Sequence, residues 1–169
     1  MDFQTPKHVA DYMVKLLCLP RESWILEPTP GDGAIVESLS EYGYHIWIPE
    51  DDFWSMEHHK YVGQINYHGI VMNLPFTPMK LGYKFLYECM NLSSNIVALM
   101  PWLTIINSQK RTFDIMSFGL KSITHLPRNI FPGSRVQTCI LHMKKYWDYP
   151  TEFIDYNKES NFNLTNDEK

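Results

Sequence analysis

The pattern of apolar and polar positions along the chain predicts its helices and strands. Val9, Met13 and Leu17 recur at the spacing of one helix face after the start signal Thr5-Pro6, which predicts a helix near the N-terminus. Short apolar runs bounded by Gly, Pro or charged residues predict strands. The expected helices span residues 5–19, 34–43, 80–93 and 109–119, and the expected strands span 24–26, 44–52, 61–65, 69–76, 95–101, 121–127 and 135–145.

The order of these elements favours an α/β fold. Strands that alternate with helices build a mostly parallel sheet covered on both faces. The last two strands are joined by the turn-rich segment "RNIFPGS", so we expect an antiparallel hairpin at the C-terminal edge. We assign residues 1–147 to one domain, because a chain of 169 residues suffices for a single core. Residues 148–169 are polar and acidic with few apolar anchors, and they predict a disordered tail.

Composition and charge limit the possible functions and cellular locations of the protein. The formal charge of −4 argues against a dedicated sequence-reading nucleic-acid binder, which usually carries a basic excess. The N-terminus lacks the apolar core of a signal peptide, and no apolar run is long enough to cross a bilayer. Cys18, Cys89 and Cys139 lie far apart without a CxxC pair, so neither a disulfide framework nor a zinc site is indicated. We therefore expect a cytoplasmic protein (or a viral or phage protein in its host's cytoplasm) with no membrane partner and no metal.

Polar residues follow the predicted strands at the edge where parallel sheets bind ligands. The first strand leads into "EPTPGDG", in which Gly31 and Gly33 let the backbone turn sharply and approach a ligand. Such a loop alone is equally consistent with a plain turn. Glu27 would repel a phosphate but would suit a ligand with a cationic amine. The loop thus favours an amino-acid-like head group.

The second strand ends in Glu50, roughly 20 residues past the glycine loop, where a carboxylate can hold a ribose diol. A solvated acidic turn is the alternative interpretation of this residue. Glu50 and Glu27 together indicate a site for S-adenosylmethionine.

The stretch "NLPF" (residues 73–76) ends the predicted strand 69–76 and is suited to hold an amine. The Asn73 side-chain oxygen and the Leu74 carbonyl can accept both hydrogens of one exocyclic amine and orient its lone pair. Phe76 would stack on the base that carries this amine. Pro75 biases Leu74 toward an extended backbone and so fixes the direction of its carbonyl.

These motifs together resemble the class I S-adenosylmethionine-dependent methyltransferases, specifically the N6-adenine DNA methyltransferases with the gamma motif order. The resemblance covers roughly residues 3–145. The stretches that carry it are "FQTPKHVADYMVKLL" (similar to motif X), "ILEPTPGDG" (motif I), "IWIPEDD", "GIVMNLPF" (the "NPPF/NPPY" motif) and the final hairpin "LPRNIFPGSRVQTCILHMKK". It implies a Rossmann-like sheet and S-adenosylmethionine as the cofactor.

The resemblance also implies roles for individual residues. The cofactor's methionine end would contact the N-terminal stretch and the glycine loop, its ribose would contact Glu50, and its adenine would contact the segment "VGQI". The target adenine would lie against the "NLPF" stretch. Neither a general base nor a metal is implied. The cofactor-binding residues would be Phe3, Thr5, Pro6, Glu27, Thr29, Gly31, Gly33, Glu50, Gln64, Ile65 and Asn73, and the catalytic residues would be Asn73, Leu74, Pro75 and Phe76.

The chain departs from the family pattern at three points. Leu74 replaces a proline, which keeps the carbonyl but loosens the loop. Gln64-Ile65 replaces an acid followed by an aromatic at the adenine of the cofactor. No target-recognition domain follows the hairpin, so sequence specificity would come from a partner subunit, be relaxed or be absent. The basic residues between Lys110 and Lys145 are either a DNA-binding face or an ordinary solvated surface.

Three functions remain open at this stage. The leading hypothesis is methyl transfer from S-adenosylmethionine to N6 of adenine in DNA. A related enzyme would methylate RNA or a protein amide, because "NPPF/NPPY" loops serve planar amines there too. The third is a catalytically impaired methyltransferase fold that acts as a binding or regulatory partner, a hypothesis favoured by Leu74 and Gln64.

Overall fold

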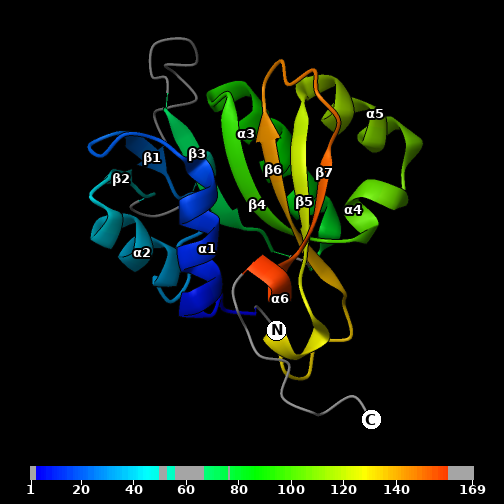
Figure 1. The fold of residues 1–169 in the computed structure, drawn as a ribbon, viewed down its shortest axis with the longest axis horizontal. Helices are drawn as coiled ribbons and strands as arrows, with labels where there is room; N and C mark the ends of the chain where they lie inside the picture. Colours follow the sequence, from blue (N-terminus) through cyan, green and yellow to red (C-terminus); the bar gives the residue numbers. More distant parts are fainter. Residues whose placement is uncertain (1–2, 50–52, 56–66, 76, 160–169) are drawn as a thin grey trace.

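The computed structural model describes residues 3–49, 53–55, 67–75 and 77–159. These residues form a seven-stranded sheet in the order β2-β1-β3-β4-β6-β5-β7, and Figure 1 shows it from β2 on the left to β7 on the right. The parallel half contains β1 (Trp24–Leu26), β2 (His45–Trp47), β3 (Gly69–Asn73) and β4 (Asn95–Pro101). The expected strand at residues 61–65 lies outside the described residues.

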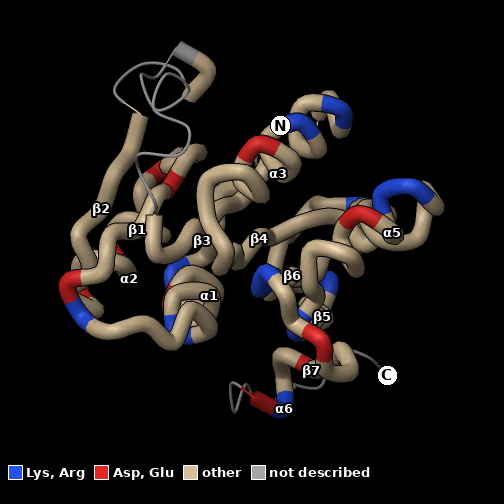
Figure 2. Tube along the Cα trace, turned by 90° about the horizontal axis from the view of Figure 1, so that it is seen from above, with Lys and Arg blue, Asp and Glu red and all other residues tan. Residues whose placement is uncertain are grey.

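Helices cover both faces of this sheet, as the alternating pattern predicts. On one face α1 (Lys7–Leu17) and α2 (Ala34–Tyr42) pack on a core that includes Val71 and Val97. On the other face α3 (Met79–Leu92) packs on a core that includes Met72 and Ala98. Neighbouring strand residues point to opposite faces, and helices cover both faces, which explains why β3 and β4 are apolar apart from Asn73 and Asn95. Figure 2 shows α1 and α3 on opposite sides of β3 and β4.

The C-terminal half is built around one reversed strand. β6 (Thr138–Lys144) is antiparallel to β4 and to β5 (Leu120–His125), which confirms the expected antiparallel pairing. α5 (Gln109–Phe118) starts after Ser108, whose side chain accepts a hydrogen bond from the Arg111 amide, a standard N-cap. Shorter elements are α4 (Leu103–Ile106), the 3-10 turns η1 (Phe53–Ser55) and η3 (Arg128–Ile130), and two elements at the C-terminal end, β7 (Glu152–Asp155) and α6 (Tyr156–Glu159).

The prediction of a disordered tail from residue 148 is wrong for the stretch that contains β7 and α6. β7 pairs in parallel with β5 and forms the edge of the sheet in place of the predicted hairpin. Tyr156 is 1% exposed, and its hydroxyl donates to the His8 carbonyl at 3.3 Å. Its ring also lies 5.2 Å from the ring of Tyr12 on α1. The buried Tyr156 and the pairing of β7 with β5 therefore order a segment whose polar sequence predicts disorder. Residues 160–169 lie outside the described part.

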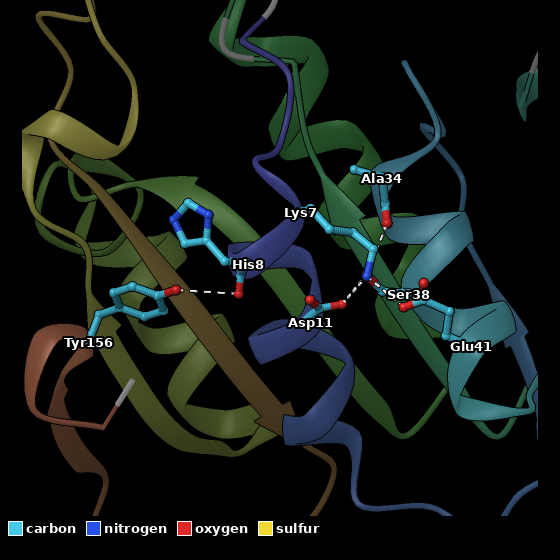
Figure 3. Close-up of polar contacts among 7 residues, drawn as sticks. All are labelled: Lys7, His8, Asp11, Ala34, Ser38, Glu41 and Tyr156. Carbon is cyan, nitrogen blue, oxygen red and sulfur yellow. Dashed lines mark hydrogen bonds and ion pairs between the residues drawn. The ribbon is translucent and has the colours of Figure 1, made fainter. Parts of the chain in front are cut away.

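Polar contacts fix α1 against α2. Lys7 Nζ contacts Asp11 Oδ1 at 2.5 Å and Glu41 Oε2 at 2.6 Å, and these hydrogen bonds raise the pKa of Lys7. Ser38 Oγ donates to Asp11 Oδ1 at 2.7 Å. Figure 3 shows these groups on one side of α1 and Tyr156 on the other. Because α1 and α2 both begin beside the pocket described below, these contacts also fix two of its walls.

Among the described helices, none combines the length and the apolar character that a membrane crossing needs.

Candidate active site

A cavity of about 280 Å³ opens where the carboxyl ends of β1 and β3 meet the start of α2. Three segments line it: residues 3–5, residues 29–31 with the first turn of α2, and residues 73–75. This is the edge at which open α/β sheets bind ligands. The residues that line it are Phe3, Gln4, Thr5, Thr29, Pro30, Gly31, Ala34, Ile35, Asn73, Leu74 and Pro75.

Most of the described candidate site residues meet at this cavity. Phe3, Thr5, Thr29 and Gly31 line it together with the catalytic candidates 73–75. Three other candidates, Pro6, Glu27 and Gly33, do not line it. Four candidates lie outside the described residues: Glu50, Gln64, Ile65 and Phe76.

The glycine loop adopts conformations that other residues rarely reach. Gly31 has φ +51°, and Gly33 has φ +88° at the N-terminus of α2. A Cβ at Gly31 would lie 2.5 Å from Gln4 Oε1, closer than any real contact, whereas a Cβ at Gly33 would meet no atom within 4 Å. Gly31 therefore permits a close approach, and Gly33 permits the turn into the helix.

Gln4 is a pocket residue that the sequence reasoning missed. Its Oε1 accepts a hydrogen bond from the Asp32 amide at 2.9 Å. The N-terminal segment is thereby tied to the glycine loop, and one loop amide is already satisfied from within the chain. The sequence signal for Gln4 is its position between Phe3 and Thr5, which are both candidate cofactor-binding residues.

Glu27 lies behind the pocket wall, not in it. Its side chain is fully buried, and Oε1 accepts hydrogen bonds from the Thr29 amide at 2.7 Å and from the Thr29 hydroxyl at 3.1 Å. Its Oε2 has no hydrogen-bond partner among the described residues. Burial raises the pKa of this carboxyl to about 8, because a charge is poorly solvated in the interior. The carboxylate would be stabilised by a nearby cation, and Thr29 stands between it and the cavity.

Asn73 presents one side of its amide to the cavity. Its Nδ2 donates to the Phe3 carbonyl at 2.8 Å, and its own carbonyl accepts from the Thr29 hydroxyl at 3.0 Å. No donor among the described residues contacts Oδ1, so this oxygen is available to accept a hydrogen bond. The end of β3 is thus tied to both other walls of the pocket.

Leu74 and Pro75 join the pocket to α3. The Leu74 side chain is 2% exposed and packs in the same core as Phe85 and Leu86. A Cβ at Gly82 would lie 2.7 Å from the Pro75 carbonyl oxygen, so α3 approaches the loop closely at its glycine. The leucine that departs from the family motif therefore has a packing role.

Two basic residues of the segment 110–145 make contacts within the chain. Lys110 pairs with Asp114 at 2.7 Å. Arg111 donates to the Thr104 carbonyl at 2.8 Å and lies 3.6 Å over the Tyr83 ring. Figure 2 shows the basic positions of α5 apart from those near β5 and β6.

No protein-family model and no curated protein matches the sequence. Solved structures do match its fold. The methyltransferase subunit of a type I restriction-modification system from Streptococcus thermophilus superposes with a TM-score of 0.73 at 16% identity, over 94% of this chain and 48% of that one. A modification subunit of a type I restriction enzyme from Vibrio vulnificus gives a TM-score of 0.73 at 15% identity, over 90% of this chain and 46% of that one.

A class I S-adenosylmethionine-dependent methyltransferase from Listeria monocytogenes gives a TM-score of 0.65 at 12% identity, over 90% of this chain and 65% of that one. The chain spans about half the length of the two restriction-system subunits. At these identities the likeness concerns the fold. The protein therefore has the Rossmann-like α/β fold of the class I methyltransferases, with an antiparallel C-terminal part.

Proposed function

We propose that this protein is an S-adenosylmethionine-dependent methyltransferase that acts on N6 of adenine in DNA. One observation carries the proposal: the glycine loop and the Asn73–Pro75 stretch line the same cavity, with Asn73 Oδ1 available as an acceptor. The methyltransferase fold and the restriction-system neighbours support it. In this proposal cofactor and target amine share one pocket.

The residues present fit the cofactor. Gly31 permits a close approach to the loop backbone, at a place that the flexible Gln4 side chain occupies in this structure. The buried Glu27 carboxyl with its unpartnered Oε2 makes this end of the pocket favourable for a cation. Phe3, Thr5 and Thr29 would contact the cofactor from two walls. When bound, S-adenosylmethionine supplies an electrophilic methyl group on a sulfonium.

The chain's own contribution is to hold the amine. Asn73 Oδ1 and the Leu74 carbonyl would accept its two hydrogens, which turns the nitrogen lone pair away from the base ring. This orientation is what a delocalised aryl amine needs. The hydrogen bond from Asn73 Nδ2 to Phe3 fixes the amide so that the oxygen remains the free acceptor. No general base is required, because the proton leaves from the cationic product to solvent.

We also propose that a separate subunit or protein partner supplies sequence specificity. The charge of −4 disfavours strong duplex binding by this chain alone, since such binding depends on phosphate neutralisation. The two structural neighbours are themselves described as subunits.

The experiment has two stages. Calorimetry with S-adenosylhomocysteine tests the pocket, and tritiated methyl transfer to adenine-containing DNA tests the chemistry. Asn73→Ala should lower the rate at least about 100-fold, as expected for losing an orienting acceptor, and Asn91→Ala, at an exposed position of α3, should not. Transfer that persists in Asn73→Ala would refute the catalytic assignment.

A second candidate, a methyltransferase fold that serves as a binding partner without catalysis, is favoured by Gln4. Its side chain covers Gly31 and occupies the Asp32 amide. If this interpretation is right, the wild-type protein will not bind S-adenosylhomocysteine, whereas Gln4→Ala will gain binding.

A further inference from the structure

The Thr29 hydroxyl lies between two acceptors from different parts of the pocket. Its oxygen is 3.1 Å from Glu27 Oε1 and 3.0 Å from the Asn73 carbonyl oxygen. A hydroxyl has one proton to donate. A main-chain carbonyl only accepts, and a carboxylate only accepts. When Glu27 is ionised, both acceptors therefore compete for the same proton.

Protonation of Glu27 removes this competition. A proton on Glu27 Oε1 can be donated to the Thr29 oxygen, whereas a proton on Oε2 would find no acceptor among the described residues. The Thr29 proton is then free for the Asn73 carbonyl. The state of the buried acid thus decides whether the end of β3 is held by Thr29.

The surroundings make both states of Glu27 accessible near neutral pH. The carboxyl is fully buried and Oε2 is unpartnered, and burial raises its pKa to about 8. No Lys or Arg among the described residues forms an ion pair with it. The Cys89 thiol on α3 is affected by Glu27: burial raises the pKa of that thiol, and the charge of the Glu27 carboxylate raises it further. A modest change in charge near Thr29 is therefore enough to shift the acid.

We propose that Thr29 is a positioning residue that couples the ionisation of Glu27 to the main chain at Asn73. Ionisation of Glu27 draws the Thr29 hydroxyl toward the carboxylate and releases the Asn73 carbonyl. Protonation restores the hydrogen bond from Thr29 to that carbonyl. A cation entering the pocket beside Thr29 favours the ionised acid, so its arrival is transmitted to the strand end that carries Asn73. The reverse effect follows by thermodynamic reciprocity. Only the role of Asn73 in binding an amine rests on the proposed function.

The coupling is measurable in the free protein by carbon NMR across pH. In the wild type the side-chain carboxyl of Glu27 and the backbone carbonyl of Asn73 should titrate with one midpoint. In Thr29→Val, which keeps the shape and loses the hydroxyl, the Asn73 signal should stop following that midpoint. The Glu27 midpoint should rise in this variant, because a donor to the carboxylate is lost. Thr29→Ser keeps the hydroxyl and should restore both behaviours.

Glu27→Gln provides a second variant if Thr29→Val does not fold. Its amide does not ionise, so the Asn73 signal should become independent of pH. An Asn73 carbonyl that does not move while Glu27 titrates in the wild type would overturn the coupling. So would one that still moves in Thr29→Val or in Glu27→Gln.

Calorimetry with S-adenosylhomocysteine separates this proposal from the function. If the coupling is right and the ligand binds, its ammonium should release protons from the wild type near pH 7, with fewer released from Glu27→Gln. Absence of binding in the wild type would refute the cofactor assignment, and the NMR titration would still decide the coupling.

Discussion

Gly31 has a constrained position at the pocket. Its backbone has a φ of +51°, and Gln4 Oε1 lies 2.5 Å from the point that a Cβ would occupy. Leu74 sets a different limit, because the residue lines the cavity and also packs in the core. Both residues are constrained by packing and also line the proposed ligand pocket.

Gly31→Ala is expected to abolish ligand binding in the pocket. The new methyl group would displace Gln4 and narrow the loop, and the left-handed backbone would add a strain of about 1–2 kcal/mol. Calorimetry with S-adenosylhomocysteine measures the binding, and urea unfolding measures the strain. Gly133→Ala is the matched control, because Gly133 also has a positive φ but no atom within 4 Å of the added Cβ. Equal binding by both variants would contradict the contact with Gln4.

Leu74→Ala is expected to cost stability, not chemistry. Removing a leucine side chain that is 2% exposed leaves a cavity, which typically lowers the free energy of unfolding by about 2–5 kcal/mol. The carbonyl proposed to hold the amine remains. Urea unfolding should show the loss, while methyl transfer per folded molecule stays within about threefold of the wild type. Leu103→Ala, at a residue 44% exposed, should change neither quantity much.

At the scale of elements, α1 is held from two sides. Lys7 and Asp11 contact α2, and Tyr156 of α6 contacts the other side of the helix (Figure 3). The segment just before α1 is a wall of the pocket. A contact from the C-terminal part of the chain therefore supports the position of the N-terminal pocket residues.

Tyr156→Ala is expected to destabilise the protein by about 3–5 kcal/mol, the usual cost of removing a buried aromatic ring. It should also weaken ligand binding in the pocket, since α1 loses one of its supports. Denaturant unfolding and calorimetry measure the two effects. Tyr149→Ala removes the same ring at a position 71% exposed, so a similar loss there would contradict the anchoring role of Tyr156.

At the scale of the whole molecule, two buried groups set the dependence of stability on pH. Burial raises the pKa of Glu27 from its ordinary value of 4.5 to about 8. Burial, with Lys121 and Lys144 adding to the effect, lowers the pKa of His142 from 6.5 to about 4. The folded state therefore keeps Glu27 protonated, and its stability falls as pH rises from 4.5 to 8. It keeps His142 neutral, and its stability falls as pH drops from 6.5 to 4.

The two effects oppose each other between pH 4.5 and 6.5, and above pH 6.5 the effect of Glu27 acts without that of His142. We expect the free energy of unfolding to fall by about 2 kcal/mol between about pH 6.5 and pH 8. In Glu27→Gln this fall should disappear. Urea midpoints at pH 6.5 and 8.5 test it. A wild type and a variant with parallel pH profiles would show that Glu27 does not carry this dependence.

Much of the fold could be predicted because its elements carry strong local signals. α1 and α3 show a helical period, and β3 and β4 are short apolar runs that lie buried between two helical layers. The stretch from Glu152 to Tyr156 has no such signal. It becomes a strand and a helix turn because β5 offers an unpaired edge and α1 a place for one tyrosine ring.

The sequence by itself determined the alternation of helices and strands, the glycines of the first loop, and the residues that end β3. These follow from local rules of backbone conformation and side-chain period. Only the tertiary structure decided that Glu27 is fully buried, that Gln4 lies against Gly31, and that one Thr29 hydroxyl lies between Glu27 and Asn73. Those contacts join residues far apart in the chain, and their distances depend on how the sheet and its helices pack.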